Sequence, residues 1–503
     1  MIRMTFLLAP ALMMACGSGD AGGPDTGVEG IADAGHVDLP QQDSGPVDML
    51  DDTPPEVIYY ELPAFDPGNY LDLKTQDPGV ADPGAGDPGT VDPGEDTGSP
   101  VVHCRSMDDC TPDEICDFAL QRCDPRSTWK DPYQALFSFH PPAGAAGDRI
   151  VIDGARFYTS FIGALAVKAY IGNQLLSGNW AVEVDENRIV AGVPAGASGP
   201  VKVVYEGGGT MTSAGSFGAT ATGVLACDGS TPGPGAPGTQ PFSTGPHAAG
   251  YVDMDLHATR VFYPAQCGSI RRPAIPGTWP VVGLLHGNGA LHMNLEYLGQ
   301  LLATWGFVSF MPQSQGLNEY SQDVVDALHD VISTLRGSDL SSIHPALTGV
   351  TTMTDIAFVG HSKGCARMQH VLGWDGDLKA HTKATAFLGP ADDGDVMPGL
   401  FLVIGAGHDG QSFAMFTEDA YDRQPPPRWK VFMPGGNHGS FCDHKVYYMF
   451  DGQPDITRHQ QLRTVMSFVV PLMQRAFGQA EPFATQLDSP PPSAIYDVEF
   501  QLN

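Results

Sequence analysis

A single serine between two glycines, at the end of an apolar run, constrains the fold of this 503-residue chain more than any other feature. The stretch IAFVGHSKG covers residues 356–364, and CARMQHVLG after it places Cys365, Met368 and Leu372 at helical spacing. Ser362 therefore lies on a predicted turn between a buried strand and a helix. So tight a turn strains the serine backbone and leaves room only for glycine two positions to either side. The pattern predicts an α/β domain that presents this serine as a nucleophile.

Length and charge limit the classes of function. Hydrophobic residues make up 42% of the chain, which is enough for at least one sizeable core. The formal net charge is −32, and residues 17–100 account for −18 of it, with 19 acidic residues and one lysine. An acidic chain without a basic run is a poor match for nucleic acid, because Lys and Arg supply most of that affinity. We therefore expect no nucleic-acid partner.

The N-terminus, MIRMTFLLAPALMMACGSGD, has the composition of an export signal. MMACG is similar to a bacterial lipobox, which implies a lipoprotein-type signal over residues 1–16 that ends at Cys16, with this cysteine becoming the lipidated first residue of the mature protein. An ordinary secretory signal that contains a cysteine is the alternative. Either form predicts export to the cell envelope or surface, and any membrane attachment would be by lipid.

Residues 17–100 consist largely of Asp, Gly and Pro, with aspartates every five residues in QDPGVADPGAGDPGTVDPGED. Each D-P-G favours a turn, and like charges repel, so we predict a disordered, extended tether. A calcium-binding repeat is the alternative, although the spacing matches no loop with converging carboxylates.

Four cysteines fall within 20 residues of the next segment, 101–126. In an exported chain they predict two disulfides with three open connectivities, in a small module that serves as a spacer or recognition unit. A zinc site is the alternative, and the lack of a C-x-x-C pair argues against it. The four are Cys104, Cys110, Cys116 and Cys123.

Short alternating strands with Gly and Pro turns fill residues 130–222. PPAGAAGDRIVIDGARF and IVAGVPAGASGPVKVVY resemble an IPT/TIG domain, which implies an immunoglobulin-like β-sandwich that spaces or binds. STPGPGAPGTQP then predicts a linker over 223–245.

Apolar runs alternate with helical patterns over residues 246–482, which indicates an α/β fold followed by a tail at 483–503. A nucleophilic serine needs a base and an acid on later loops. GLFLVIGAGHDG ends a strand at Asp409, and RWKVFMPGGNHGSF carries His438 after another strand. Asp392 and Asp393, which follow the previous strand, are the competing acids.

Other polar residues near these loops have their own interpretations. PVVGLLHGNG runs from a strand into an H-G loop, so we expect the backbone N–H groups of Asn288 and Lys363 to stabilise an oxyanion. His286 is expected to hold the loop by hydrogen bonds. His408, His438, Asp443 and His444 would be the set for a metal, but they lack helical H-x-x-x-H spacing.

Several motifs together resemble the α/β-hydrolase superfamily: PVVGLLHGNG, LGQLLATWGFVSFMP, VGHSKG, LFLVIGAGHD and GGNHGSF. Within it they are closest to dienelactone hydrolases, chlorophyllases and bacterial cutinase-like polyester hydrolases. The resemblance implies a Ser362–His438–Asp409 triad that needs no cofactor. Lys363 stands where polyester hydrolases typically have Met, and HGNG replaces their aromatic-bearing loop, so polyester activity is not carried over.

The four remaining cysteines of the folded region suggest two further disulfides. One would join Cys227 and Cys267 at the start of the domain. The other would join Cys365 and Cys442 beside the triad, with buried thiols as the alternative.

The sequence thus predicts an exported, lipid-anchored serine hydrolase that cleaves carboxylic esters of a small or polymeric substrate through an acyl-enzyme. One alternative is a binding or adhesion lipoprotein in which the IPT/TIG-like domain acts and the hydrolase domain is degenerate. The other is the same triad acting on amide or peptide bonds.

Overall fold

The computed structural model describes residues 103–124, 138–154, 157, 167–176, 183–184, 187–205, 209–229, 231–287, 291–313, 322–391, 395–444, 451–479 and 483–503. All of them belong to one compact unit, Pro93–Asn503. The predicted signal with Cys16, and the predicted tether at 17–100, lie outside the described residues.

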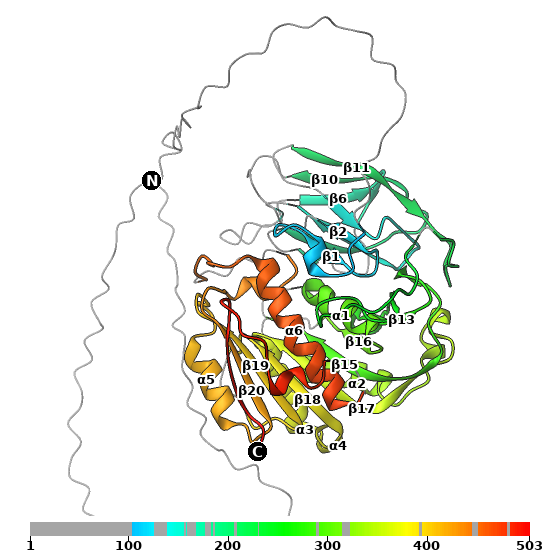
Figure 1. Ribbon diagram of the computed structural model, residues 1–503. Coiled ribbons are helices and arrows are strands. Elements are labelled where there is room, and N and C mark those ends of the chain that lie inside the picture. The colour runs from blue at the N-terminus through cyan, green and yellow to red at the C-terminus, as the bar shows by residue number, and fades with distance from the viewer. Residues whose placement is uncertain are drawn as a thin grey trace, which may run out of the picture. The chain divides into compact units, whose positions relative to one another are not determined.

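A ten-stranded sheet forms the centre of the C-terminal region, in the order β14-β12-β13-β16-β15-β17-β18-β19-β20-β21 (Figure 1). The strands are β12 (Ala248–Asp253), β13 (Arg260–Ala265), β14 (Ser269–Ile270), β15 (Gly277–Leu285), β16 (Val308–Met311), β17 (Val350–His361), β18 (Thr382–Leu388), β19 (Leu400–Ala406), β20 (Arg428–Met433) and β21 (Asp497–Gln501). From β16 to β20 neighbouring strands are parallel. Their carboxyl ends therefore meet at one edge, where loops collect functional side chains.

Helices cover both faces of this sheet because its central strands are apolar on both sides. In β17, Ala357 and Val359 join one buried cluster, and Ile356 and Phe358 join the other. The first face carries α1 (Glu296–Thr304) and α6 (Arg458–Ala476). The second carries α2 (Gln322–Leu335), α3 (Lys363–Trp374), α4 (Gly376–His381) and α5 (Ala414–Arg423). This is the predicted α/β architecture.

The last segment of the chain is not the tail that the sequence predicts. Residues 497–501 form β21, which pairs antiparallel with β20 and completes the sheet edge. Trp429 of β20 is fully buried and donates from Nε1 to the Leu487 carbonyl at 2.8 Å. Residues 483–503 are therefore part of the α/β domain.

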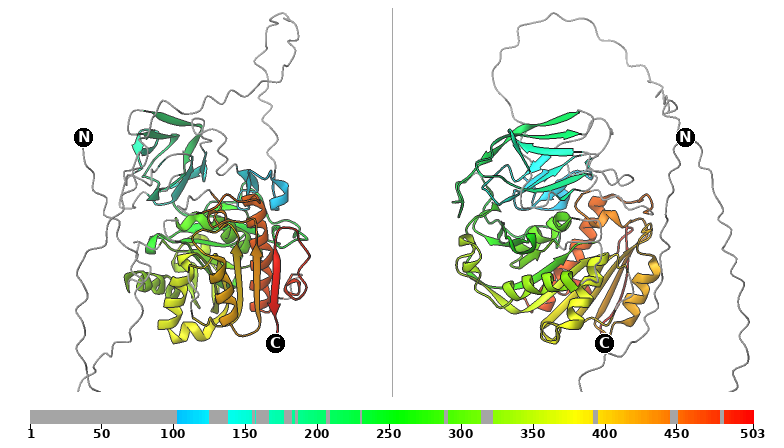
Figure 2. Two further views of the ribbon diagram at one scale, coloured as in Figure 1. Left: turned by 90° about the vertical axis from the view of Figure 1, so that its left-hand side faces the viewer. Right: turned by 180° about the vertical axis from the view of Figure 1, so that it is seen from behind.

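The IPT/TIG-like region is an immunoglobulin-like sandwich of two sheets, ordered β4-β11-β10-β6-β7 and β3-β5-β9-β8 (Figure 2). Inward side chains of both sheets, such as Ile150, Ile189 and Val203, form its own buried cluster. The strands are β3 (Ser138–His140), β4 (Ala143–Gly144), β5 (Arg149–Asp153), β6 (Val167–Ile171), β7 (Gln174–Leu175), β8 (Glu183–Val184), β9 (Arg188–Gly192), β10 (Gly199–Tyr205) and β11 (Thr210–Ala219).

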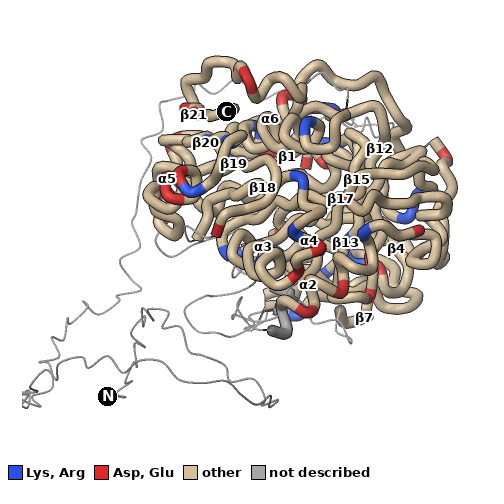
Figure 3. Tube along the Cα trace, turned by 90° about the horizontal axis from the view of Figure 1, so that it is seen from below, with Lys and Arg blue, Asp and Glu red and all other residues tan. Residues whose placement is uncertain are grey.

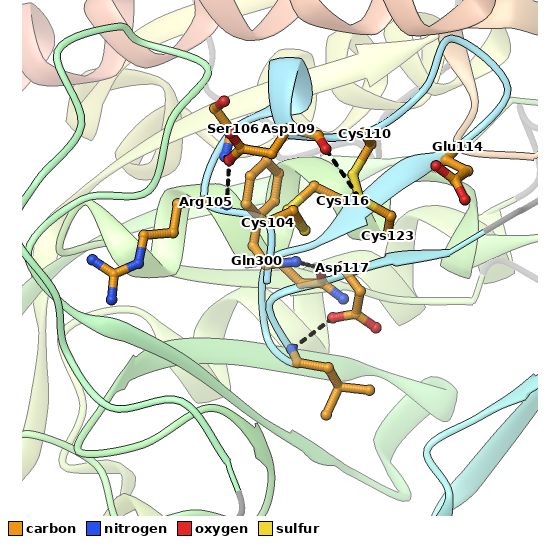
Figure 4. Close-up of a disulfide and its surroundings, with 12 residues drawn as sticks. Cys104, Arg105, Ser106, Asp109, Cys110, Glu114, Cys116, Asp117, Cys123 and Gln300 are labelled. Atoms are coloured by element: carbon orange, nitrogen blue, oxygen red, sulfur yellow. Dashed lines mark hydrogen bonds between the residues drawn. A yellow bond between two sulfur atoms is a disulfide. The ribbon is translucent and has the colours of Figure 1, made fainter. Parts of the chain in front are cut away.

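The cysteine-rich module, predicted as a spacer or recognition unit, packs against the α/β domain. Its disulfides are Cys104–Cys116 and Cys110–Cys123, which settles the open connectivity and occupies the cysteines of the zinc alternative (Figure 4). Strands β1 (Ile115–Asp117) and β2 (Arg122–Asp124) form its hairpin. The Phe118 N–H donates to Oε1 of Gln300 in α1 at 2.9 Å, and the Phe118 ring is buried in the same cluster as α1 and α6.

The predicted linker at 223–245 is also attached along its length. A Cys227–Cys267 disulfide ties it to the α/β domain, as the sequence predicts. Farther along, Phe242 is buried in the core, and the Ser243 carbonyl accepts a hydrogen bond from Trp305 Nε1 at 2.8 Å. The linker is therefore packed against the α/β domain.

Charged side chains at the surface pair across elements. Arg336 pairs with Asp377 of α4, and Lys430 pairs with Glu418 of α5, in regions where Figure 3 shows basic and acidic residues side by side. Exposed pairs of this kind contribute at most about 1 kcal/mol each. Among the described residues, no helix is both long enough and apolar enough to cross a membrane.

Candidate active site

Ser362 occupies the turn between β17 and α3, where the sequence places it. Its backbone has φ 54° and ψ −124°, a conformation that non-glycine residues rarely adopt. The Ser362 N–H donates to the Leu388 carbonyl at the end of β18, at 2.9 Å. Strained backbone of this kind persists only where its surroundings hold it, and it is concentrated at functional sites.

Glycines surround this turn because the backbone passes too close for any side chain. A Cβ on Gly360 would lie 2.8 Å from the Cys365 nitrogen, and one on Gly364 would lie 2.2 Å from the Leu285 carbonyl oxygen. A Cβ on Gly287 of the H-G loop would lie 2.9 Å from the Ser362 Cβ. The structure therefore explains both glycines of the motif and places the H-G loop against the serine.

Asp409 and His438 are in direct contact. Asp409 follows β19 and His438 follows β20, and Nδ1 of His438 lies 2.7 Å from Oδ2 of Asp409. Both side chains are fully buried. The other carboxylate oxygen, Oδ1, accepts from the backbone N–H groups of Gln411 at 2.9 Å and Ser412 at 2.5 Å. These bonds fix the carboxylate so that one oxygen faces the imidazole.

The neighbouring loop after β18 closes around this pair. A Cβ on Gly389, which has φ 51°, would lie 3.0 Å from Asp409 Oδ2 and 3.1 Å from His438 Nδ1. The ring of His361, the residue before the serine, stacks on His438 with centroids 4.6 Å apart. Ser362, Asp409 and His438 thus follow three parallel strands and lie at the same edge of the sheet, with Asp409 and His438 in direct contact.

Asp451 holds the turn that carries His438, and sequence analysis missed it. Its Oδ1 accepts the His438 N–H at 2.9 Å, and its Oδ2 accepts the Gly439 N–H at 2.8 Å. Burial raises the pKa of this carboxyl. Asp451 comes 13 residues after His438 and belongs to no recognisable motif, so only the spatial arrangement reveals it.

His361 is a fully buried imidazole. Burial lowers its pKa well below the usual value, and the neighbouring His438 lowers it further. Sγ of Cys442 lies 3.8 Å from Nδ1 of His361, and Phe441 packs against the ring. A neutral imidazole therefore fills the space behind the candidate base.

The H-G loop is held where an oxyanion site is expected. Nδ1 of His286 lies 2.8 Å from the Gly287 carbonyl, and Nη1 of Arg367 donates to the His286 carbonyl at 2.7 Å. Lys363 is the first residue of α3, so its N–H belongs to the helix N-terminus, where backbone N–H groups point outward. Asn288, the other predicted donor, lies outside the described residues.

The structure also bears on the alternative acids and on the residues of the alternative metal site. Asp392 and Asp393 lie outside the described residues. His408 turns away from the site, with Nε2 2.9 Å from Asp455 Oδ2. Among the residues that the structure describes, the set His408, His438, Asp443 and His444 does not bring its ligand atoms together.

The predicted Cys365–Cys442 disulfide is wrong. Both residues are buried and both remain thiols. Cys365 packs in the α3 side of the sheet with Phe358, and its Sγ lies 3.2 Å from the Gly360 carbonyl. Cys442 lies beside His361, an odd-numbered position of β17 that faces the other side. The sheet separates the two thiols, although both are near the triad in sequence.

Comparison with known families agrees with this arrangement. Residues 238–376 match the Chlorophyllase family model, and residues 137–220 match the IPT/TIG domain model. Chlorophyllases are one of the groups that the motifs predict, and the two matches confirm the predicted order of an IPT/TIG domain before an α/β-hydrolase domain. The first match supports an α/β-hydrolase enzyme; it includes Ser362 and ends before Asp409. The chain matches no curated protein.

Gly364, two residues after the serine, gives a direct test of the turn. Gly364→Ala should destabilise the chain by about 1–3 kcal/mol, because its Cβ would overlap the Leu285 carbonyl. Gly373→Ala, in the same helix, is the matched control, since nothing lies within 4 Å of its Cβ. Chemical denaturation of both variants measures the difference. Equal stabilities would contradict the close approach.

His361 predicts a pH dependence of stability. Its folded pKa lies below the unfolded value, so its contribution is complete above about pH 6.5 and is lost as the pH falls below that value. Between pH 7.5 and 5.0 protonation of the unfolded chain at this group should therefore lower the unfolding free energy of the wild type. Denaturant titrations should show a smaller loss for His361→Gln, whereas the exposed-site control His408→Gln should behave like wild type. A loss as large in His361→Gln as in wild type would contradict a neutral His361.

Proposed function

We propose that this protein is a serine hydrolase that cleaves carboxylic esters, with Ser362 as nucleophile, His438 as general base and Asp409 as the orienting acid. The observation that carries the proposal is the buried 2.7 Å contact between His438 Nδ1 and Asp409 Oδ2, beside a serine in strained backbone geometry. The Chlorophyllase match adds independent support for hydrolase chemistry.

The chemistry proceeds through a covalent intermediate. Asp409 accepts a hydrogen bond from the Nδ1–H group of His438, which leaves Nε2 as the base that removes the Ser362 proton. The serine oxygen attacks the ester carbonyl, and His438 then gives the proton to the departing alkoxide. Water, deprotonated by His438, releases the carboxylic acid from the acyl-enzyme and restores the serine.

Negative charge on the carbonyl oxygen needs donors during both steps. The Lys363 N–H is one donor, at the N-terminus of α3, where the helix dipole favours negative charge. The H-G loop provides the second, and the Arg367 bond to the His286 carbonyl holds that loop in position. Asn288 is the donor that we propose on this loop.

Mutation of the triad tests the function in the full-length chain. With p-nitrophenyl butyrate and octanoate, Ser362→Ala and His438→Ala should lower kcat by about 10³-fold or more, because each removes a group of the covalent step. Asp409→Asn should lower it by about 10²–10⁴-fold. The matched control is His408→Ala, which removes an imidazole next to Asp409 that pairs with Asp455 instead.

Two results would contradict the proposal. One is wild-type hydrolysis of both esters no faster than that of Ser362→Ala, in chains with the same circular dichroism spectrum. The other is an equal loss in His408→Ala and His438→Ala. Cleavage of an anilide but of neither ester would favour the amide alternative.

We also propose that the chain is exported and anchored through a lipid on Cys16, with a small or polymeric ester as substrate and no nucleic-acid partner. The three disulfides support export, because disulfides persist in oxidising compartments. Cys16→Ser should shift the expressed chain from the membrane fraction to the soluble fraction, whereas Ser18→Ala should not. Fractionation with an immunoblot measures this, and retention of Cys16→Ser on the membrane would contradict the anchor.

A further inference from the structure

Side chains from separate segments hold the turn that carries His438, residues 438–443, and one of them comes from the β-sandwich. Within the α/β domain, Asp451 accepts from the His438 backbone, and the Tyr297 hydroxyl donates to the Phe441 carbonyl at 3.1 Å. At the end of the turn, Asp443 pairs with Arg188. Arg188 belongs to β9 of the sandwich.

The Arg188 guanidinium joins three separate segments. Its Nε donates to Asp153 Oδ1 at 2.6 Å, across the paired strands β5 and β9. Its Nη1 donates to Asp443 Oδ1 at 2.8 Å and to the Met293 carbonyl at 3.0 Å. Met293 follows the H-G loop in the chain. The Arg188 side chain therefore reaches both the turn that carries His438, which we call the base turn, and the segment after the H-G loop.

These charges are removed from water. The side chains of Arg188 and Asp443 are fully buried, and Asp153 is nearly so. A buried ion pair with further hydrogen bonds is rigid, and removal of one partner leaves the other charge uncompensated. The Asp443 N–H also donates to the Asn294 carbonyl at 3.0 Å. The end of the turn that carries His438 and the segment after the H-G loop are therefore bonded to each other as well as to Arg188.

Arg458, at the start of α6, belongs to the same buried cluster. Burial lowers its pKa to about 10, and Asp443 opposes that shift. The cationic neighbours of Asp443 therefore include Arg458 from its own domain and Arg188 from the sandwich. Arg188 bonds both Asp443 and the segment after the H-G loop.

Other ionic contacts of the sandwich lie away from the base turn. His140 Nε2 lies 3.0 Å from Glu296 Oε2, and Arg271 Nη2 lies 3.0 Å from Asp148 Oδ2. They attach the sandwich to α1 and to the segment after β14, and they do not involve residues 438–443. His140 also lies 3.9 Å from Asp153, the partner of Arg188, so the Arg271 contact is the control for the loss of domain attachment in general.

We propose that the sandwich is part of the catalytic unit and that Arg188 is a positioning residue for His438, acting through Asp443. This inference rests on the proposed function, because it assigns a partner in the fold to the proposed base. The sandwich then fixes the position of the imidazole, in addition to any binding role of its own.

The test compares variants of the full-length chain on p-nitrophenyl butyrate. Arg188→Met should lower kcat by about tenfold or more with KM changed less than threefold, because a small displacement of the base slows chemistry more than binding. Arg188→Lys should recover part of the loss. Asp443→Asn should reduce kcat similarly, and adding it to Arg188→Met should cost little more, since both act through one contact.

Arg271→Met is the matched control, since it removes a buried sandwich contact that does not reach the base turn. It should leave kcat within about twofold of wild type. If it lowers kcat as much as Arg188→Met does, general loosening of the domains explains the effect and the inference is wrong. An unchanged kcat in folded Arg188→Met would overturn it as well; if that variant does not fold, Asp443→Asn decides by the same criterion.

A phosphonate probe separates this inference from the proposed function. A fluorophosphonate reacts with an activated serine whatever the natural substrate. Slower labelling of Arg188→Met than of Arg271→Met supports the inference. Equal labelling rates for wild type and Arg188→Met overturn the inference alone. A folded wild type that is not labelled overturns the proposed function and, with it, the inference.

Discussion

The backbone strain at Ser362 is the constraint on which the site depends. The residue can hold φ 54° only because glycines at 360, 364 and 287 let β17, α3 and the H-G loop approach within contact distance. That packing places the N-terminus of α3 and Ser362 at the same edge of the sheet. The parallel strands β19 and β20 then deliver an acid and a base to that edge. The geometry of the site is thus a consequence of strand order and close backbone packing.

Burial keeps the Asp409–His438 contact away from water and fixes its geometry. A carboxylate enclosed by two backbone N–H groups, with an imidazole against its remaining oxygen, keeps its orientation without solvent. Behind it, His361 and Gly389 fill the space, and Asp451 fixes the backbone of the base turn. The candidate site is therefore held in place by groups behind the Asp409–His438 pair, which is the preorganisation that the proposed catalysis would need.

Sequence reasoning predicted local geometry well and long-range pairing only in part: the Cys227–Cys267 disulfide is present, and the Cys365–Cys442 disulfide is not. The strand–turn–helix at Ser362, and the order of Asp409 and His438 after later strands, follow from periodicity and glycine placement over a few residues. The Cys365–Cys442 prediction failed because nearness in the chain to the triad does not show which face of the sheet a side chain takes. The alternation of side chains along β17 decides which face each residue takes. That alternation could have been inferred from the sequence, and it places Cys365 and His361 on opposite faces of the sheet.

Other features had no local signal. Asp451 bonds a backbone N–H 13 residues away and Arg188 bonds a carboxylate 255 residues away, and contacts of that kind leave no periodic pattern in the sequence. The predicted spacer, linker and tail proved to be packed parts of one unit, because a few buried side chains such as Phe118, Phe242 and Trp429 attach segments whose composition resembles loops.

The covalent step is the central claim, and trapping the intermediate tests it most directly. A brief reaction with p-nitrophenyl octanoate, stopped with acid and digested for mass spectrometry, should yield the peptide containing Ser362 with one octanoyl group. The same peptide from Asp409→Asn should carry much less in the same time. Turnover of the ester with acylation of a different residue, or with no acylated peptide under any quench time, would contradict the account.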